Sequence, residues 1–276
     1  MNERDFEFTD RDFKYIRQLV TENTGIVLGE HKRDMVYGRL VRRLKVHKIR
    51  RFSDYCDIIK SGDEQEMIEL VNSLTTNLTS FFRENHHFEY LKKTVLPELM
   101  KINALTRRIR IWSAGCSTGE EPYSIAMVVN EVIPRNAGWD VRILATDLDS
   151  NVVAKASSGI YDISRVEGID RGRTGKWMRK GRGDHAGSVM MGSELREMIT
   201  FKQLNLLHDW PMKGPFDVIF CRNVVIYFDK DTQRVLFNRY ADLMANHGTL
   251  FIGHSESLFK VSDRFKLIGQ TMYNKV

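Results

Sequence analysis

From residue 108 to the end of the chain, apolar runs typical of buried strands alternate with helical segments. The candidate strands are RIRIWSA (108–114), VRILATD (141–147), ITFKQLN (199–205), FDVIFCRN (216–223) and TLFIGHS (249–255). Helical patterns lie between them, most clearly at residues 122–132 and 231–246. Because each helix returns the chain to the same end of the sheet, this alternation predicts an α/β fold with a mainly parallel sheet. The final residues, 265–276, can add a pair of edge strands.

The first part of the chain has helical periodicity instead. In the first of these segments Thr9 or Asp10 is the N-cap candidate, and Gly25 is the stop signal. The predicted helices span residues 8–25, 33–46, 52–60, 64–74 and 86–103. We therefore expect an N-terminal all-helical domain with a linker at residues 1–90, followed by a sheet domain at residues 91–276.

One segment of the sheet domain does not follow the strand and helix rhythm. Residues 159–192 hold eight of the 19 glycines and seven Lys or Arg residues. Such a composition is typical of turns and short hairpin strands. We predict a small antiparallel β subdomain inserted at residues 159–200.

The composition limits the class of protein. Of the 276 residues 42% are hydrophobic and 28% are charged, as in globular proteins. No apolar run reaches the roughly 18 residues needed to span a bilayer, and the polar start MNERDFEFTD is not a signal peptide. Three separated cysteines without a CxxC pair are typical of free thiols in a cytoplasmic protein. We expect a cytoplasmic monomer without direct membrane insertion.

The net charge of +6 is unevenly distributed. Residues 31–51 hold nine Lys or Arg residues against one Asp. Within this stretch Arg39, Arg42 and Arg43 have helical spacing and would cluster on one side. Such a face fits an acidic partner, which can be phosphates, an acidic protein surface or anionic lipid. The alternative is an ordinary solvated helix face.

The turn after the first strand, SAGCSTGEEP, is suited to a cofactor. Gly115 and Gly119 allow a tight turn at the carboxyl end of a strand, where nucleotide-like ligands bind. No GK[ST] follows, so the turn is not a P-loop, and the Glu pair at the helix start would repel phosphates. S-adenosylmethionine has no phosphate and carries a cationic sulfonium, while Asp147 can accept hydrogen bonds from ribose hydroxyls. The sequence favours a Rossmann-like, class I S-adenosylmethionine-dependent methyltransferase over a dehydrogenase.

A series of longer motifs resembles a known family. The motifs NSLTTNLTSFFRE, SAGCSTGEEPYSIAM, ATDLD, SSGIY, LNLL, FDVIFCRNVVIYFD and GHSESL occur in this order. They are similar to those of the bacterial chemotaxis receptor methyltransferases, the CheR family, over residues 8–275. The resemblance implies methyl transfer from S-adenosylmethionine to Glu side chains on the signalling helices of methyl-accepting chemotaxis proteins. The products would be glutamate methyl esters and S-adenosylhomocysteine.

The resemblance also implies roles for individual residues. Arg83 and Tyr227 match the pair near the reacting methyl group. The residues that match cofactor contacts are Asn77, Thr79, Arg83, Glu121, Asp147, Asn205, Leu206, Arg222 and Asn223. Arg39, Arg42 and Arg43 would meet the Glu-rich receptor helices. No metal is implied, and the adjacent His86 and His87 cannot chelate as an i, i+4 pair can.

Two departures from the family pattern leave points open. Other members can have Ala in place of Gly115 and Cys116, and since all these residues are small we expect little effect. The inserted segment GRGDHAGS diverges more, so a tether to the receptor's C-terminal tail peptide through residues 159–200 is left open.

Two other classes of function compete with this one. A nucleic-acid methyltransferase could use the same basic stretch, but the fourth strand runs into CRNVVIYF and not into the [DN]PP[YF] tetrad of amino-group methylators, and no aromatic stacking platform is evident. A non-catalytic S-adenosylmethionine sensor would not need Arg83 and Tyr227, which are both present.

Overall fold

The computed structural model describes residues 5–276 and contains, over that range, a seven-stranded sheet and a three-stranded sheet. The order of the large sheet is β6-β2-β1-β7-β8-β10-β9. Its first five strands are parallel, whereas β10 and β9 are added antiparallel at one edge. The strands are β1 (Arg108–Ala114), β2 (Asp140–Asp147), β6 (Ile199–Gln203), β7 (Phe216–Cys221), β8 (Met244–Ile252), β9 (Phe265–Gly269) and β10 (Met272–Lys275). The predicted strands and the edge pair are confirmed, but the bounds of the fifth strand differ. It begins at Met244, inside the helix predicted at residues 231–246, and ends at Ile252 and not at residue 255.

Strand order places a ligand site at one point of the sheet. From β1 the chain moves outward to β2 and β6, and then returns to β7 on the other side of β1. The loops after β1 and β7 therefore leave the sheet in opposite directions and open a crevice between them. In open α/β sheets this switch point is where ligands bind.

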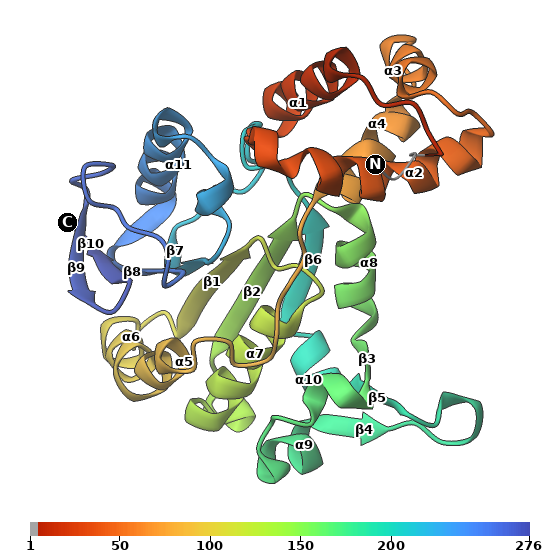
Figure 1. Ribbon diagram of the computed structural model, residues 1–276. Helices are drawn as coiled ribbons and strands as arrows, with labels where there is room; N and C mark the ends of the chain where they lie inside the picture. The colour runs from red at the N-terminus through yellow and green to blue at the C-terminus, as the bar shows by residue number, and fades with distance from the viewer. Residues whose placement is uncertain (1–4) are drawn as a thin grey trace.

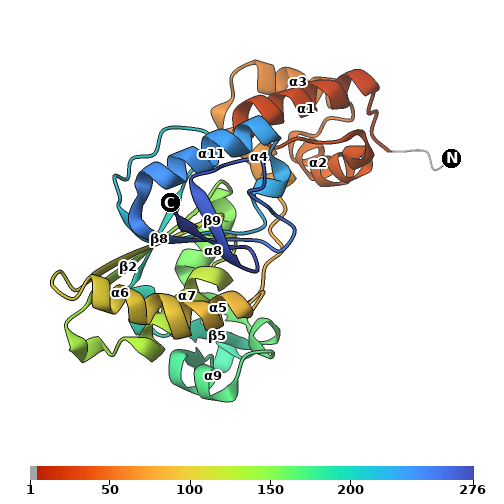
Figure 2. The ribbon, with the colours of Figure 1, turned by 90° about the vertical axis from the view of Figure 1, so that its left-hand side faces the viewer.

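Helices cover both faces of the sheet (Figure 2). On β1, Ile109 and Ile111 face one core, which is packed against α7 (Glu120–Val132), whereas Trp112 and Ala114 face the other core, packed against α11 (Lys230–Leu243). This alternation follows from the period of two along a strand. Helix α8 (Ser150–Ser158) follows β2, and Asp149 is its N-cap residue.

Four helices with a core of their own form the N-terminal domain, above the strand ends in Figure 1. They are α1 (Asp10–Thr24), α2 (Arg33–His47), α3 (Phe52–Lys60) and α4 (Glu64–Leu74). Thr9 caps α1 in a capping box with Asp12, and Gly25 ends the helix at φ +71°, as the stop signal predicted. The predicted helices of this domain are confirmed to within a residue or two.

Residues 75–85 form a linker that runs from α4 down across the sheet to α5 (Figure 1). The chain then continues through α5 (His86–Tyr90), a π-helical turn (Leu91–Val95) and α6 (Leu96–Ile102). Phe88 is 1% exposed and packs in the core of the sheet domain. The helix that follows the linker therefore belongs to the sheet domain from its first turn.

The inserted segment forms the small sheet, in the order β3-β5-β4, at the end of the large sheet away from the helical domain (Figure 1). Its strands β3 (Ile160–Asp162), β4 (Met178–Lys180) and β5 (Ser188–Met191) are antiparallel, as predicted. Two short helices, α9 (Arg171–Trp177) and α10 (Ser193–Arg196), accompany them. β6 begins at Ile199 and pairs with β2, so the last two residues of the predicted insertion lie in the large sheet.

Candidate active site

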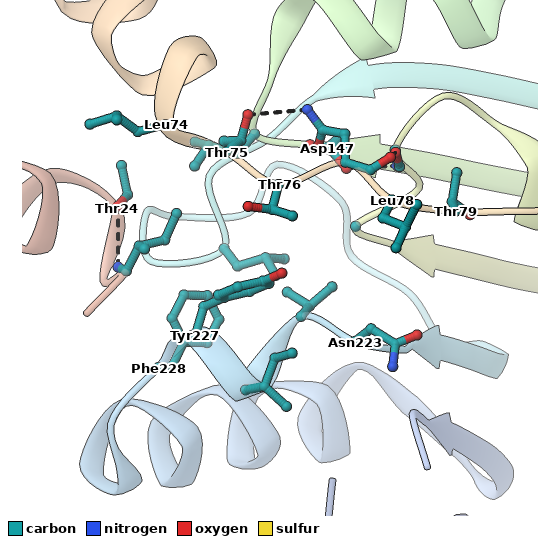
Figure 3. Close-up of a pocket in the computed structure, with 18 of the residues that line it drawn as sticks. Thr24, Leu74, Thr75, Thr76, Leu78, Thr79, Asp147, Asn223, Tyr227 and Phe228 are labelled. Carbon is teal, nitrogen blue, oxygen red and sulfur yellow. Dashed lines mark hydrogen bonds between the residues drawn. The ribbon is translucent and has the colours of Figure 1, made fainter. Parts of the chain in front are cut away.

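A cavity of about 410 Å³ lies at the carboxyl ends of the parallel strands, a size typical of small-molecule sites. The loops after β1, β2, β6 and β7 form its floor. The linker lines one side, and Asn223, Tyr227 and Phe228 line the side opposite to it (Figure 3). Every residue for which the family resemblance implies a cofactor or methyl-group contact lines this cavity: Asn77, Thr79, Arg83, Glu121, Asp147, Asn205, Leu206, Arg222, Asn223 and Tyr227.

Gly115 shapes the turn after β1. Its φ is +86°, a conformation that favours glycine, and a Cβ atom there would meet Val224 Cγ2 at 2.3 Å. Both residues line the cavity. The expectation that Ala at this position changes little is wrong for this chain, because the side chain across the turn leaves no room for a methyl group.

Two carboxylates reach the cavity from the sheet domain. Glu121 accepts a hydrogen bond from Ser113 Oγ at 2.7 Å and pairs with Arg222 at 3.1 Å. Asp147 accepts from the backbone N–H groups of Ser117 at 2.7 Å and Asp149 at 3.0 Å. Burial raises the pKa of Glu121 although Arg222 opposes it, and burial raises the pKa of Asp147 to about 6. Both acids are thus set in place before a ligand arrives.

Glu120 has a different role from its neighbour. It is 1% exposed and pairs with Arg165 of the inserted segment, which also donates to the Thr79 carbonyl at 2.9 Å. Thr118 Oγ1 donates to the same carboxylate at 2.6 Å. Of the two glutamates that the sequence placed at the helix start, only Glu121 lines the cavity.

Asp149 holds the linker at the carboxyl ends of the strands through hydrogen bonds. Its Oδ1 caps α8, while its Oδ2 accepts from Thr75 Oγ1 and from Asn77 Nδ2, each at 2.8 Å. Asp149 is only 3% exposed. This contact directs residues 77–79 along the cavity wall. The sequence placed Asp149 just beyond the second strand, but nothing in the local pattern showed that it would bind a segment more than 70 residues earlier.

Arg83 and Tyr227 enter the cavity from different elements. Arg83 lies in the linker and donates from Nη1 to the Leu78 carbonyl at 2.9 Å. Tyr227 lies in the loop after β7, and its carbonyl accepts from Val27 N at 2.9 Å. One residue comes from the linker and the other from the sheet domain. Their presence in the same cavity therefore depends on how the linker crosses the sheet.

Arg222 is held inside the protein. Its side chain is 2% exposed, and it lies 3.1 Å from Glu121 and 3.2 Å from Glu84 of the linker. It also donates to the Arg83 carbonyl. Its guanidinium therefore joins the linker to the start of α7, and its position at the cavity depends on these two carboxylates.

Part of the cavity wall comes from a segment that no motif assigned to the cofactor site. Residues 24–35, between α1 and the start of α2, line the side of the helical domain. Asn205 Nδ2 donates to the Asn23 carbonyl at 2.7 Å, which joins the last turn of α1, just before this segment, to the loop after β6. Lys32 and Met35 reach the cavity from there. Lys32 belongs to the basic stretch, but its spacing did not set it apart from the other cations.

The three arginines assigned to the substrate have different environments. Arg43 binds Glu66, which is 3% exposed and also accepts from Tyr55 and His47. Burial acts to raise the pKa of Glu66, but these hydrogen bonds outweigh it and lower that pKa to about 2. Arg39 donates to the carbonyls of Leu74 and Thr75 at the linker. Only Arg42 is exposed, so two of the three arginines are engaged in contacts within the protein.

Within residues 5–276, no group of three or more His, Cys, Asp or Glu side chains is placed to hold a metal ion. His87 is fully buried and contacts the Gln270 carbonyl at 3.1 Å. No helix in the described part of the chain is long and apolar enough to cross a bilayer.

Comparison with known proteins assigns the family. The sequence matches "CheR methyltransferase, SAM binding domain" over residues 77–274 and "CheR methyltransferase, all-alpha domain" over residues 11–75. The chain belongs to the CheR family. The two CheR matches meet at the start of the linker.

Full-length relatives agree with this family assignment. "Chemotaxis protein methyltransferase" of Escherichia coli K12 is 42% identical, with 99% of this chain and 93% of that protein covered. "Probable chemotaxis protein methyltransferase" of Rhizobium etli is 41% identical, covering 92% of this chain and 96% of that one. "Chemotaxis protein methyltransferase 2" of Pseudomonas aeruginosa is 40% identical, with 98% and 95% covered. The fold is thus that of a CheR methyltransferase, with an all-helical domain, a mainly parallel sheet and a small antiparallel sheet.

The CheR cavity fits S-adenosylmethionine. A turn without a Cβ atom at Gly115 leaves room beside the strand end. The buried Glu121 and the half-buried Asp147 suit a ligand with a positive sulfur, an ammonium group and ribose hydroxyls. Glu120 and Glu121 at the start of α7 disfavour a diphosphate at that helix end. The donor set therefore matches a cationic nucleoside better than a dinucleotide.

Replacing Gly115 with Ala should weaken S-adenosylmethionine binding by roughly tenfold or more, because the left-handed backbone disfavours Ala and because Val224 must move into the cavity. Isothermal titration calorimetry measures the change. Gly62→Ala is the matched control: its φ is also +86°, but a Cβ atom there meets nothing within 4 Å. Equal cofactor affinity in the two variants would contradict the steric explanation.

Cofactor affinity should fall as the pH is lowered through about 6. The pKa of Asp147 is about 6, and its ionised form is the one that accepts hydrogen bonds at both oxygens, so protonation below that pH competes with binding, at most tenfold per pH unit. Dissociation constants measured from pH 5 to pH 7 test this. Asp147→Asn should bind more weakly at pH 7 and lose most of the pH dependence. A wild-type affinity that is constant over this range would exclude the role.

Proposed function

We propose that this protein transfers the methyl group of S-adenosylmethionine to glutamate side chains of methyl-accepting chemotaxis proteins, giving glutamate methyl esters and S-adenosylhomocysteine. It is then a protein-glutamate O-methyltransferase of chemotactic signal transduction. The observation that carries the proposal is the cavity, in which a linker arginine and a tyrosine of the β7 loop accompany the acids Glu121 and Asp147. Its place of action would be the cytoplasm, beside the receptor signalling helices, and we expect it to act as a monomer.

The reaction needs neither a general base nor a metal. A Glu carboxylate has a reference pKa near 4.3 and is ionised at neutral pH. When bound, the cofactor supplies a methyl group activated by a positive sulfur. The protein must therefore align the carboxylate with that methyl group and keep water out.

Arg83 and Tyr227 supply the alignment. An arginine at the cavity can offset the desolvation of the incoming carboxylate. Arg83 shares its guanidinium with the Leu78 carbonyl, so it is held in direction by a neutral acceptor and keeps donors for the substrate. The Tyr227 hydroxyl would orient one carboxylate oxygen. Asn77 and Thr79 would contact the cofactor from the linker, and Asn205, Leu206, Arg222 and Asn223 from the strand ends.

The receptor helix would approach along one face of α2. Met35, Arg39 and Arg42 are spaced by four and three residues and lie on the same side of the helix. Met35 lines the cavity, as does Lys32 one turn earlier, and Arg42 lies about 10 Å farther along the axis. In the described part of the chain neither Lys32 nor Arg42 has an ion-pair partner within 4 Å. These two cations would meet receptor carboxylates, while Arg39 holds the linker and Arg43 holds Glu66.

The inserted subdomain has a structural link to the cavity. Arg165 joins it to Thr79 of the linker. A receptor tail peptide docked on residues 159–200 would therefore bind a subdomain that contacts an element lining the active site. Whether this chain uses such a tether stays a prediction for peptide binding to test.

Methyl-labelled S-adenosylmethionine given with receptor-containing membranes should label receptor protein, and mild base should release the label as methanol. Arg83→Ala should abolish labelling with cofactor binding weakened but measurable. Tyr227→Phe should lower kcat roughly tenfold with little change in cofactor affinity. Tyr15→Phe, on the far helix α1, is the control.

The same assay separates the alternatives. Stable label on RNA or DNA would replace this proposal with a nucleic-acid methyltransferase. Cofactor binding without label on any of these substrates would support a sensor.

Arg42→Glu combined with Lys32→Glu should raise the apparent KM for receptor by roughly tenfold at low salt, since each exposed charge pair contributes up to about 1 kcal/mol. Since Lys32 lines the cavity, cofactor affinity is measured in the same variants and should change by a smaller factor than the receptor KM. The effect on KM should shrink as salt is added. Lys14→Glu, an exposed cation on α1, controls for net charge. An unchanged receptor KM would exclude this face as the receptor contact.

A further inference from the structure

The GHSESL motif after β8 has no part in the chemistry described so far, yet it holds a buried carboxylate. Glu256 is 6% exposed. Its carboxylate accepts hydrogen bonds from the backbone N–H groups of Asn223 at 3.0 Å, Ile226 at 3.3 Å and Gly253 at 2.5 Å. Two of these donors belong to the loop after β7, which carries Tyr227. One carboxylate thus joins the loops that leave two neighbouring strands.

A second buried side chain donates hydrogen bonds to carbonyl groups of the loop after β7. Gln233 of α11 is 7% exposed, and its Nε2 donates to the carbonyls of Val225 at 2.8 Å and Phe228 at 3.0 Å. Within residues 222–228, Glu256 therefore accepts from two N–H groups, and Gln233 donates to two carbonyls. Residues 225–227 form only a single 3-10 turn, and the two side chains give partners to polar groups that this turn does not pair, such as Asn223 N–H and the Phe228 carbonyl.

The backbone of this loop needs such support. Asn223 has φ +59°, which is an uncommon conformation for a residue other than glycine. A Cβ atom at Gly253 would meet Asn223 Nδ2 at 2.4 Å, so the close approach of the two loops depends on glycine there. Val225 of the loop after β7 and Leu258 of the loop after β8 are buried in the same core, so apolar packing also holds the two loops.

We propose that Glu256 and Gln233 are positioning residues for methyl transfer, which hold the backbone of residues 222–228 so that Tyr227 faces the substrate carboxylate. Neither side chain lines the cavity, so both act through the loop. The inference rests on the proposed function, since it assigns how the Tyr227 hydroxyl is held for that reaction. Misplacing a reacting or orienting group by about 1 Å can lower a rate by up to about 100-fold.

The test is Glu256→Gln, in which an amide replaces one acceptor oxygen and turns a donor toward one of the N–H groups. We expect kcat for receptor methylation per folded molecule to fall by up to about tenfold, which is the loss expected when the Tyr227 hydroxyl is removed altogether, and cofactor affinity to change by a smaller factor. In the Tyr227→Phe background the same substitution should have only a small further effect, because its main route to the reaction is already removed.

Asp217→Asn is the matched control. Asp217 is 7% exposed and accepts from Arg110 N at 2.7 Å, Asn103 Nδ2 at 3.1 Å and His247 Nε2 at 2.9 Å. It lies at the start of β7, at the opposite end of that strand from the cavity. This substitution should lower the unfolding temperature while leaving kcat per folded molecule unchanged. Gln233→Leu, which removes the donors to the two carbonyls, should reproduce the Glu256→Gln kinetics and carries the test if Glu256→Gln does not fold.

The outcomes are distinct. A kcat for both loop variants equal to that of Asp217→Asn would overturn the positioning role, as would an undiminished effect of Glu256→Gln in the Tyr227→Phe background. If the wild-type chain itself transfers no methyl group to receptor, the proposed function fails and this inference fails with it.

Discussion

The active site depends on one buried guanidinium. Arg222 leaves the end of β7 and meets Glu121 of α7, Glu84 of the linker and the Arg83 carbonyl. Without a cation at this point, two carboxylates would be buried close together. The linker would also lose one of its attachments to the sheet domain, which include the contacts of Asp149 with Asn77 and of Arg165 with Thr79. Removing one partner from such a buried group costs about 3–5 kcal/mol. This charge cluster and Asp149 hold the linker at two of the places where it crosses the strand ends, and Arg165 holds it at Thr79 between them.

The two carboxylates that pair with Arg222 have pKa values that are shifted in opposite directions. Burial raises the pKa of Glu121. Burial also acts to raise the pKa of Glu84, but the hydrogen bond from His254 and the charge of Arg222 outweigh it and hold that pKa at about 2. Glu84 therefore carries a firm negative charge for the cation, while Glu121, which lines the cavity, is an acid whose charge a cationic ligand would favour. The same guanidinium fixes the linker and leaves one acid responsive to the cofactor.

Much of the fold followed from local patterns. The strand at residues 108–114 and the helices at 52–60 and 64–74 have the predicted bounds, because their periodicity and their caps are local properties. The residues implied by the CheR motifs also came together around one cavity, since the carboxyl ends of parallel strands lie at one edge of a sheet. The sequence predicted that Arg43 contacts the receptor, whereas Arg43 binds the buried Glu66. Helical spacing shows which side of the helix a residue faces, but it does not show which partner lies on that side.

By itself the sequence determined the order of strands and helices, the turn at Gly115, the acids at 121 and 147 and membership of a methyltransferase family. These depend on residues close together in the chain. Only the tertiary structure decided which cations stay free, that residues 24–35 close the cavity, and that Asp149, Glu256 and Gln233 hold the linker and the β7 loop. Those contacts mostly join buried polar groups to backbone or side chains on other elements, as Asp149 does with Asn77 and Glu256 with Asn223, and no periodicity in the chain encodes which distant group will satisfy a buried carboxylate.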